Sequence, residues 1–296
     1  MTSSTAQKIA NKQNGNELGI KRTDSLSEQT VAEVRSFAQR QPIHVMALPR
    51  KVHVDSTQGV SAYASCPLYE LNLCAAMRNK TQSVADLHPG ASQLTSSTHT
   101  VPARRMIFHP KEWSEFVLFI CSGRAASSIA LPDGRRQILS LLLPGDIVFS
   151  TGLFEPVSGR AVEAITEVTY RKFKRSEFKA LLFEYSDLFE MLTKIWSEER
   201  ARADQLALDL GRRTADERIA RLILNLAERL AERGMMNGQA MEFPLRQRHI
   251  ADATGLTPVH VSKVLGQFQR AGLIEISSRS LTITDATELR RVAGPQ

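Results

Sequence analysis

RQRHIADATGLTPVHVSKVLGQFQR, residues 246–270, is the stretch of sequence that decides the C-terminal fold. It holds two helical patterns separated by a tight turn at Gly255, because glycine adopts the positive φ that such a turn needs. Small and apolar side chains of the first pattern let one helix cross the other closely: Ile250, Ala251 and Ala253. The stretch therefore predicts a helix-turn-helix unit.

The second helix of this unit has one apolar face and one polar face. Its apolar side chains recur at helical spacing and are expected to face inward: Val261, Val264, Leu265 and Phe268. The opposite face is the one that a recognition helix presents to the major groove of DNA. The side chains expected to contact base edges are Thr257, Val259, His260, Ser262 and Lys263. Those expected to contact phosphates are Arg246, Arg248, Gln267 and Arg279.

Segments on both sides of the helix-turn-helix extend the same domain. AGLIEISSRSLTIT, residues 271–284, alternates apolar and polar residues and predicts a hairpin, which would form a wing. Upstream, Thr214 and Glu217 have capping-box spacing before an apolar helical pattern, so a new domain is expected to begin there. Residues 212–296 carry 13 basic and 9 acidic side chains, which favours a polyanionic partner. A three-helix bundle without a DNA partner is the alternative.

The middle of the chain predicts a β-domain followed by a long helix. From about residue 101 to about residue 180, short apolar runs alternate with turn sequences, the pattern of a compact antiparallel domain. From Phe178 to about Gly211, apolar residues recur at threes and fours over about thirty residues. This stripe would be buried most simply against a second copy of the chain, although a core helix within one chain is the alternative. The expected seam residues are Leu188, Leu192, Ile195 and Leu206.

Composition excludes a membrane-spanning protein and a disulfide-stapled miniprotein. The 296 residues suffice for roughly two domains, and no apolar run approaches the roughly 18 residues of a membrane span. The N-terminus lacks the apolar stretch of a signal peptide, and three cysteines cannot all pair, so a cytoplasmic location is expected. Residues 1–60 are expected to form a largely disordered extension, because the first part of this segment is polar.

Together these segments resemble the Crp/Fnr family of bacterial transcription regulators, in its Fnr/FixK-like branch. The resemblance covers roughly residues 61–290 and rests on PDGRRQILSLLLPGDIV, residues 132–148, and on the helix-turn-helix. It implies an α+β fold with a β-roll similar to cyclic-nucleotide-binding domains, a dimerisation helix and a C-terminal winged helix-turn-helix. The expected boundaries are 61–185 for the β-roll, 186–211 for the helix and 212–296 for the winged domain.

The resemblance also implies a function. Members of the family are homodimers that bind a palindromic promoter site, respond to a signal and contact RNA polymerase, and are not enzymes. Their recognition helix often carries Glu, then Ser or Gly, then Arg; here these positions are Val259, Ser262 and Lys263. Val packs on a thymine methyl and Lys donates to guanine without Arg's planar fork, so the resemblance leaves the half-site open. The alternative is a small-molecule-binding signalling module whose C-terminal domain docks a protein.

Residues that bind cyclic nucleotides in similar proteins are mostly replaced. Members with a cyclic-nucleotide site carry a Gly-Glu-Leu segment and an Arg-Ser or Arg-Thr pair. The matching positions are Phe149-Ser150-Thr151 and Arg160-Ala161, so the ribose acceptor is missing. We therefore expect no cyclic AMP site and take Arg160 as a structural or surface arginine.

The cysteines match an iron–sulfur site only in part. Fnr-like oxygen sensors hold their cluster with four Cys thiolates. Cys66 and Cys74 correspond to two of them, while Tyr63 and Tyr170 stand at about the places of the others. No cluster, no metal and no cofactor are therefore expected. Cys66 and Cys74 are either a redox-active pair or packing residues, and Cys121 is expected to be a buried strand residue.

Overall fold

The computed structural model describes residues 94–148, 153–154 and 157–295. All of them belong to one compact unit, Gln58–Gln296. The extension expected at residues 1–60 and the pair Cys66 and Cys74 lie outside the described residues. In the part of the chain that is described, no helix combines the length and the apolar character needed to cross a membrane.

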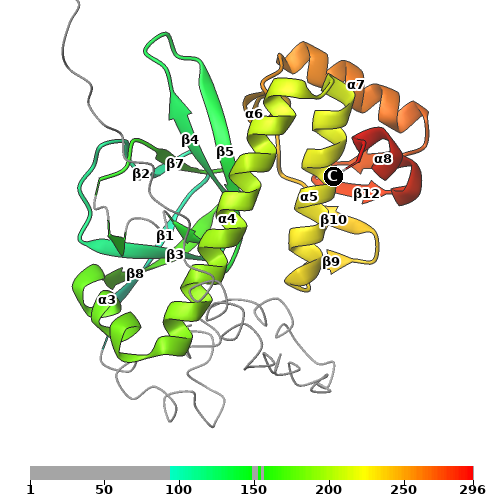
Figure 1. Cartoon of the computed structure of the whole chain (residues 1–296). Coiled ribbons are helices and arrows are strands. Elements are labelled where there is room, and N and C mark those ends of the chain that lie inside the picture. Colours follow the sequence, from blue (N-terminus) through cyan, green and yellow to red (C-terminus); the bar gives the residue numbers. More distant parts are fainter. Residues whose placement is uncertain (1–93, 149–152, 155–156, 296) are drawn as a thin grey trace, which may run out of the picture. The chain divides into compact units, whose positions relative to one another are not determined.

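The first domain is a β-roll made of two four-stranded sheets (Figure 1). One sheet has the order β1-β8-β3-β6 and the other has the order β2-β7-β4-β5. The strands are β1 Ser96–Val101, β2 Met106–Phe108, β3 Phe116–Ser122, β4 Ala125–Ala130, β5 Arg136–Leu142, β6 Ile147–Val148, β7 Ala161–Ala164 and β8 Val168–Lys174. Paired strands in both sheets are antiparallel, which confirms the β-domain predicted from the apolar runs.

Alternation along β3 supplies side chains to two apolar cores. Phe119 belongs to one core and its neighbour Ile120 to the other, because successive side chains of a strand point to opposite faces. At the centre of the first core, the ring of Phe119 lies 5.6 Å from Phe173 and 5.5 Å from Phe178, measured between centroids. Phe178 belongs to the helix that follows β8, so this aromatic cluster fixes that helix to the sheet.

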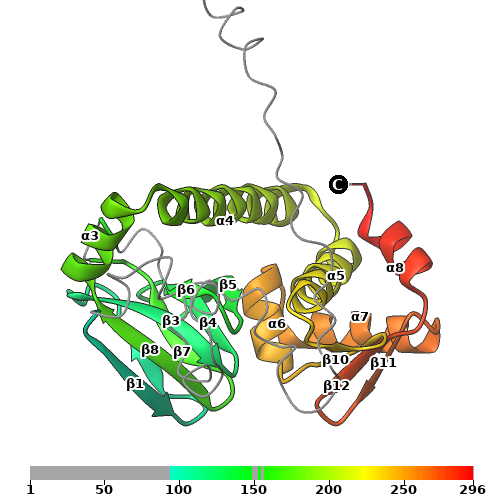
Figure 2. The same ribbon diagram turned by 90° about the horizontal axis from the view of Figure 1, so that it is seen from below.

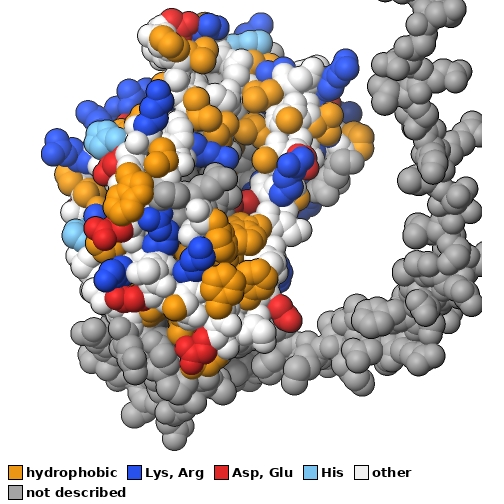
Figure 3. Space-filling view, turned by 60° about the vertical axis from the view of Figure 1, so that its left-hand side comes forward, with side chains coloured by type: hydrophobic (Ala, Val, Ile, Leu, Met, Phe, Trp, Pro, Cys, Tyr) orange, Lys and Arg blue, Asp and Glu red, His pale blue; other side chains and the backbone are white. Residues whose placement is uncertain are grey.

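Two exposed aromatic rings of this domain carry a cation over their face. The Arg175 guanidinium lies 5.4 Å from the centroid of Trp113, and the Lys179 ammonium lies 4.9 Å from that of Phe154. On the side of the molecule shown in Figure 3, Lys and Arg side chains stand beside hydrophobic ones. Cation–π contacts such as those of Arg175 and Lys179 stabilise aromatic rings that are exposed to water.

A break at Tyr185 divides the expected long helix into α3 Arg175–Glu184 and α4 Ser186–Arg212. The backbone of Tyr185 is extended, with φ −119° and ψ 107°, although its N–H still donates to the carbonyl of Leu181. The expectation of one continuous helix from Phe178 is therefore wrong. The end of α4 agrees with the end expected near Gly211, and Figure 2 shows α4 running from α3 toward the C-terminal domain.

Two of the four residues expected in the dimer seam are buried within the chain itself. Leu188 and Leu192 are 4% and 1% exposed and lie in the same core as Phe119. Ile195 is half-buried at the edge of that core, and Leu206 is half-buried further along the helix. Because the first turns of α4 cover their own β-roll, the assignment of Leu188 and Leu192 to an intermolecular seam is wrong.

The C-terminal domain is a winged helix-turn-helix. Its helices are α5 Ala215–Glu232, α6 Gln247–Thr254, α7 Pro258–Arg270 and α8 Ala286–Ala293. Its sheet has the order β11-β12-β10-β9, with strands β9 Met236–Asn237, β10 Ala240–Glu242, β11 Ile274–Ser277 and β12 Ser280–Ile283. The capping box at Thr214 and Glu217 starts α5 as expected. Gly255 has a φ of 68°, as the predicted turn requires.

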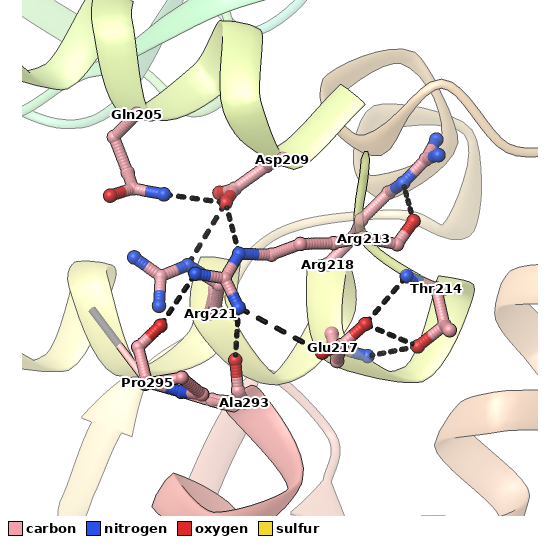
Figure 4. Close-up of polar contacts among 9 residues, drawn as sticks. All are labelled: Gln205, Asp209, Arg213, Thr214, Glu217, Arg218, Arg221, Ala293 and Pro295. Atoms are coloured by element: carbon pink, nitrogen blue, oxygen red, sulfur yellow. Dashed lines mark hydrogen bonds and ion pairs between the residues drawn. The ribbon is translucent and has the colours of Figure 1, made fainter. Parts of the chain in front are cut away.

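The junction between α4 and α5 is held by a network of ion pairs (Figure 4). The Asp209 carboxylate lies 3.0 Å from the Nε atoms of both Arg213 and Arg221. Arg213 also donates to the backbone carbonyls of Ala293 and Pro295, at 3.1 and 2.6 Å. Both guanidinium groups are largely buried. The network therefore ties the end of α4, the first turns of α5 and the residues at and after the end of α8 to one another.

Candidate nucleic-acid interface

The inner face of α7 is buried, as its apolar spacing predicts. Each of its apolar side chains is at most 7% exposed: Val261, Val264, Leu265 and Phe268. The Thr257 hydroxyl caps the helix by accepting a hydrogen bond from the His260 N–H at 3.2 Å, and Pro258 occupies the first helical position. The core and the cap together fix the helix, so its outer face has a defined orientation.

The outer face of α7 brings together the side chains expected to contact bases. Val259 is 81% exposed, a high value for a branched apolar side chain. The other expected residues on this surface are also exposed: His260, Ser262, Lys263 and Gln267. Thr257 is exposed too, but its hydroxyl already accepts the capping hydrogen bond from the His260 N–H. It is therefore less available for a hydrogen bond to a base than the sequence suggested.

Arg246 and Arg279, two expected phosphate contacts, lie on separate elements of the same domain. Arg246 is the N-cap of α6, and Arg279 lies in the turn between β11 and β12. Both side chains are exposed. The backbone carbonyl of Arg279 accepts a hydrogen bond from the Phe243 N–H at 2.6 Å, which fixes the wing turn to the end of β10. Exposed guanidinium groups on fixed backbone are suited to orient a domain on the phosphates of a duplex.

Arg248 has a partner that the sequence did not indicate. Its guanidinium lies 3.7 Å from the carboxylate of Glu163 on β7, and its side chain remains 50% exposed. A phosphate that bound Arg248 would therefore share this guanidinium with Glu163. Among the expected phosphate contacts, Arg248 is the one that also faces the β-roll.

His249 is a residue of this region that the sequence analysis missed. Its Nδ1 accepts a hydrogen bond from the Arg246 N–H at 3.2 Å, in the way that a capping-box side chain returns to the N-cap. Burial lowers the pKa of the imidazole below its ordinary value of 6.5, and the nearby Arg248 and Arg136 guanidinium groups lower it further. The signal that could have revealed it is its position three residues after the N-cap.

The β-roll positions that a cluster or a nucleotide would use are only partly described. Tyr170 is 6% exposed in the core, its ring 5.5 Å from that of His99, and burial raises the pKa of its hydroxyl. Cys121 is half-buried on β3 rather than fully buried, and Arg160 is exposed, as expected of a surface arginine. Residues 149–151 lie outside the described part. Among the described residues, no group of three His, Cys, Asp or Glu side chains is placed to hold a metal ion.

Comparison with known proteins identifies both domains. The cyclic nucleotide-binding domain matches residues 98–185, and the Crp-like helix-turn-helix domain matches residues 217–292. The transcriptional activator protein FnrA of Stutzerimonas stutzeri is 30% identical over 191 residues, which cover 64% of this chain and 77% of FnrA. The chain belongs to the Crp/Fnr family. The nitrogen fixation regulation protein FixK of Bradyrhizobium diazoefficiens, 32% identical over 167 residues, covers 55% of this chain and is itself covered to 68%.

A solved structure agrees with this family and with its fold. The structure of FixK2 from Bradyrhizobium japonicum aligns with 69% of this chain and with 100% of its own, with a TM-score of 0.63 and 28% identity. The Crp/Fnr fold expected from the sequence is thereby confirmed. This Crp/Fnr protein is a DNA-binding transcription regulator, and its family consists of such regulators.

Proposed function

We propose that this regulator binds a palindromic promoter site as a homodimer, with the α7 helix of each copy in the major groove of one half-site. The observation that carries the proposal is the outer face of α7. An exposed polar surface around Val259 lies opposite a fully buried face, and exposed Arg246 and Arg279 lie on neighbouring elements. A homodimer with two-fold symmetry matches two such helices to the two halves of a palindrome.

Within the groove, the side chains divide into base contacts and phosphate contacts. Lys263 donates to the acceptor atoms of guanine, and Val259 packs on a thymine methyl group. Arg246 and Arg279 bind phosphates and orient the domain without selecting a sequence. Gln267, one turn further along α7 than Lys263, lies where a side chain leaves the bases and reaches the backbone.

The exposed face of α4 supplies the dimer seam in this proposal. Phe189 and Ala203 are two heptads apart, and Ala207 follows one turn after Ala203. Trp196, midway between Phe189 and Ala203, is half-buried because it also packs against the core of the β-roll. Phe189 is 37% exposed, and Ala203 and Ala207 are exposed as well. This face is displaced around the helix from Leu188 and Leu192, which the β-roll already covers.

The remaining parts of the function follow the family. FnrA is named a transcriptional activator, which supports activation of transcription as the working mode of this chain. The contact with RNA polymerase follows from the family resemblance. A signal received by the β-roll would shift the population of the dimer geometry that fits DNA. The place of action is then the cytoplasm, where a bacterial promoter is found.

A binding-site selection with the full chain tests the proposal. The unmodified protein should enrich a palindrome, and its affinity should fall steeply with salt because phosphate binding releases counterions. Val259→Glu places an acceptor on the outer face, so it should shift the preference at one position of each half-site from thymine to cytosine. Enrichment of no sequence, or an unchanged preference in the variant, would contradict the assignment of α7. Capture of a protein with no DNA binding would favour the alternative of a protein-docking module.

A further inference from the structure

The C-terminal domain and the β-roll share one apolar core. Ile138, Leu141 and Leu143, from β5 and the turn after it, belong to the same cluster as Ile219 and Leu226 of α5. Leu143 is completely buried although it is in a turn of the β-roll. The position of the DNA-binding domain relative to the β-roll is therefore set by packing as well as by the covalent connection through α4.

Asp146 is an anchor at one end of this shared core. Its two carboxylate oxygens accept from the guanidinium groups of Arg229 and Arg233, at 2.6 and 2.7 Å. The Leu143 N–H also donates to this carboxylate, at 2.8 Å, so the backbone of the β-roll holds the acceptor in place. Arg229 makes a further bond to the carbonyl of Leu141 at 2.8 Å. Asp146 thus fixes the C-terminal half of α5 on the β-roll.

Arg136 is the second anchor, and it acts on a different helix. Its Nε and one terminal nitrogen donate to the same oxygen of Asp252 on α6, at 2.9 and 2.7 Å. Its other terminal nitrogen donates to Glu163 on β7, which holds the guanidinium in the plane that Asp252 requires. The side-chain amide of Gln137 donates to the carbonyl of Ala253 at 3.1 Å. Charge-assisted bonds of this type specify geometry more than they add stability.

Two anchors on two helices restrict rotation as well as distance. α6 ends at Thr254 and the cap of α7 is Thr257, so the direction of α7 follows that of α6 through a tight turn. Neither anchor covers the outer face of α7, where Val259 remains 81% exposed. The arrangement that the anchors hold is therefore one in which α7 is available to DNA.

We propose that Arg136 and Asp146 are positioning residues that set where each recognition helix stands relative to the β-roll, and thereby the half-site spacing that the dimer accepts. This inference rests on the proposed homodimer on a palindrome. In such a dimer the two β-rolls are fixed to each other through α4, so a rigid link from each β-roll to its α7 fixes the separation of the two helices. Without the link, each DNA-binding domain would adjust to several spacings.

The test measures affinity for palindromes whose central spacer is correct, one base pair shorter or one base pair longer, and for a single half-site. The full chain is compared with Arg136→Ala and with Asp252→Ala, which removes the same bridge from the side of α6. Each variant should lose about fivefold or more of the discrimination between spacers while the half-site affinity stays within about twofold of the unmodified chain. The double variant should lose no more than either single one, because both changes remove one interaction.

Arg135→Ala is the matched control. Arg135 is the neighbour of Arg136, its side chain is 77% exposed, and its ion pair is with Asp133 in the same turn. Its removal should leave the spacer preference unchanged. A merely structural role of Arg136 would lower the melting temperature without relaxing the spacer preference, and that result would overturn the inference. If the unmodified chain bound the palindrome no better than a half-site, the homodimer proposal itself would fail instead.

Discussion

His249 lies where α6 meets the β-roll, and its neighbours make the stability of this contact depend on pH. The charged groups that face it are Arg248 on its own helix, Asp252 one turn on, and Arg136 and Glu163 from the β-roll. Burial and the two guanidinium groups lower its pKa in the folded state. The unfolded chain therefore binds a proton more readily than the folded one, and stability falls as the pH drops through about 6.5.

His249→Gln should flatten this dependence. Between about pH 7.5 and about pH 5.5, the melting temperature of the unmodified protein should fall more than that of the variant, because glutamine does not titrate. His260→Gln is the control, since His260 is exposed on the same domain. Equal slopes for the unmodified protein and His249→Gln would show that another group carries the dependence.

Lys263 and Arg279 should separate base recognition from phosphate binding. Lys263→Ala should cost about 1–3 kcal/mol on the preferred palindrome and much less on random DNA, because it removes a donor to a base edge. Arg279→Ala should weaken binding to both similarly and lower the salt slope by about one per half-site. Fluorescence anisotropy over a series of salt concentrations measures both effects. A uniform loss for Lys263→Ala would place Lys263 on a phosphate.

At this scale the outer face of α7 was predictable, because periodicity alone separates Val259 and Lys263 from the buried Val261 and Val264. The use of the basic side chains was not. The excess of Lys and Arg after residue 211 indicated a polyanionic partner. Several of these arginines form ion pairs inside the chain, with Asp146 or Asp209: Arg213, Arg221, Arg229 and Arg233. Local sequence spacing does not indicate such pairs when the carboxylate is distant in the sequence.

Among the elements, α4 carries a prediction about assembly. Ala203→Glu places a carboxylate on the face proposed as the seam, opposite its own copy in a two-fold dimer. Unpaired like charges buried in this way cost several kcal/mol, about enough to separate a dimer at micromolar concentration. Light scattering should therefore report one chain for this variant and two for the unmodified protein.

Ala201→Glu is the matched control for this experiment. Ala201 is also exposed on α4. It lies two residues before Ala203, so its side chain is on roughly the opposite side of the helix from the proposed seam. This variant should remain a dimer. Dissociation of both variants would indicate a general loss of the helix, and dimers in both cases would place the seam elsewhere.

Helices and strands were predictable in kind and less so in extent. The apolar runs indicated the strands of the β-roll, and the capping box at Thr214 marked the start of α5 within a residue. The apolar spacing alone could not predict the break at Tyr185, because Leu181, Leu182, Tyr185 and Leu188 keep helical spacing across it. The boundary expected between residues 185 and 186 came from the family resemblance. The same spacing could not distinguish a face buried against the β-roll from a face buried against a second copy, which is why Leu188 and Leu192 were misassigned.

For the whole molecule, the shared core predicts cooperative unfolding. Because Leu143 packs into the core of the C-terminal domain, the described domains should melt together in one calorimetric transition. Leu143→Ala should cost about 2–5 kcal/mol and split the transition in two. Leu118→Ala, in a core that belongs to the β-roll alone, should lower the melting temperature without splitting the transition. Two transitions in the unmodified protein would contradict the shared core.

The contact between the two domains was beyond reach from the sequence. Local patterns predicted a β-roll and a winged helix-turn-helix separately. Asp146 and Arg229 are far apart in the sequence, and no sequence motif indicates that they form an ion pair. The side chains of β5 that enter the shared core, such as Ile138 and Leu141, look like ordinary strand residues.

The shared core also limits how freely such a regulator can be recombined. Suppose that a chimera joined this winged domain, at the end of α4, to a β-roll that covered α5 without an equivalent of Asp146. It would bury Arg229 and Arg233 without a carboxylate. Buried guanidinium groups without a partner are strongly destabilising. In an engineered exchange, the surface of β5 and the turn that follows it should therefore be transferred together with the winged domain. The segment to be transferred in such an experiment therefore includes residues on both sides of the domain boundary.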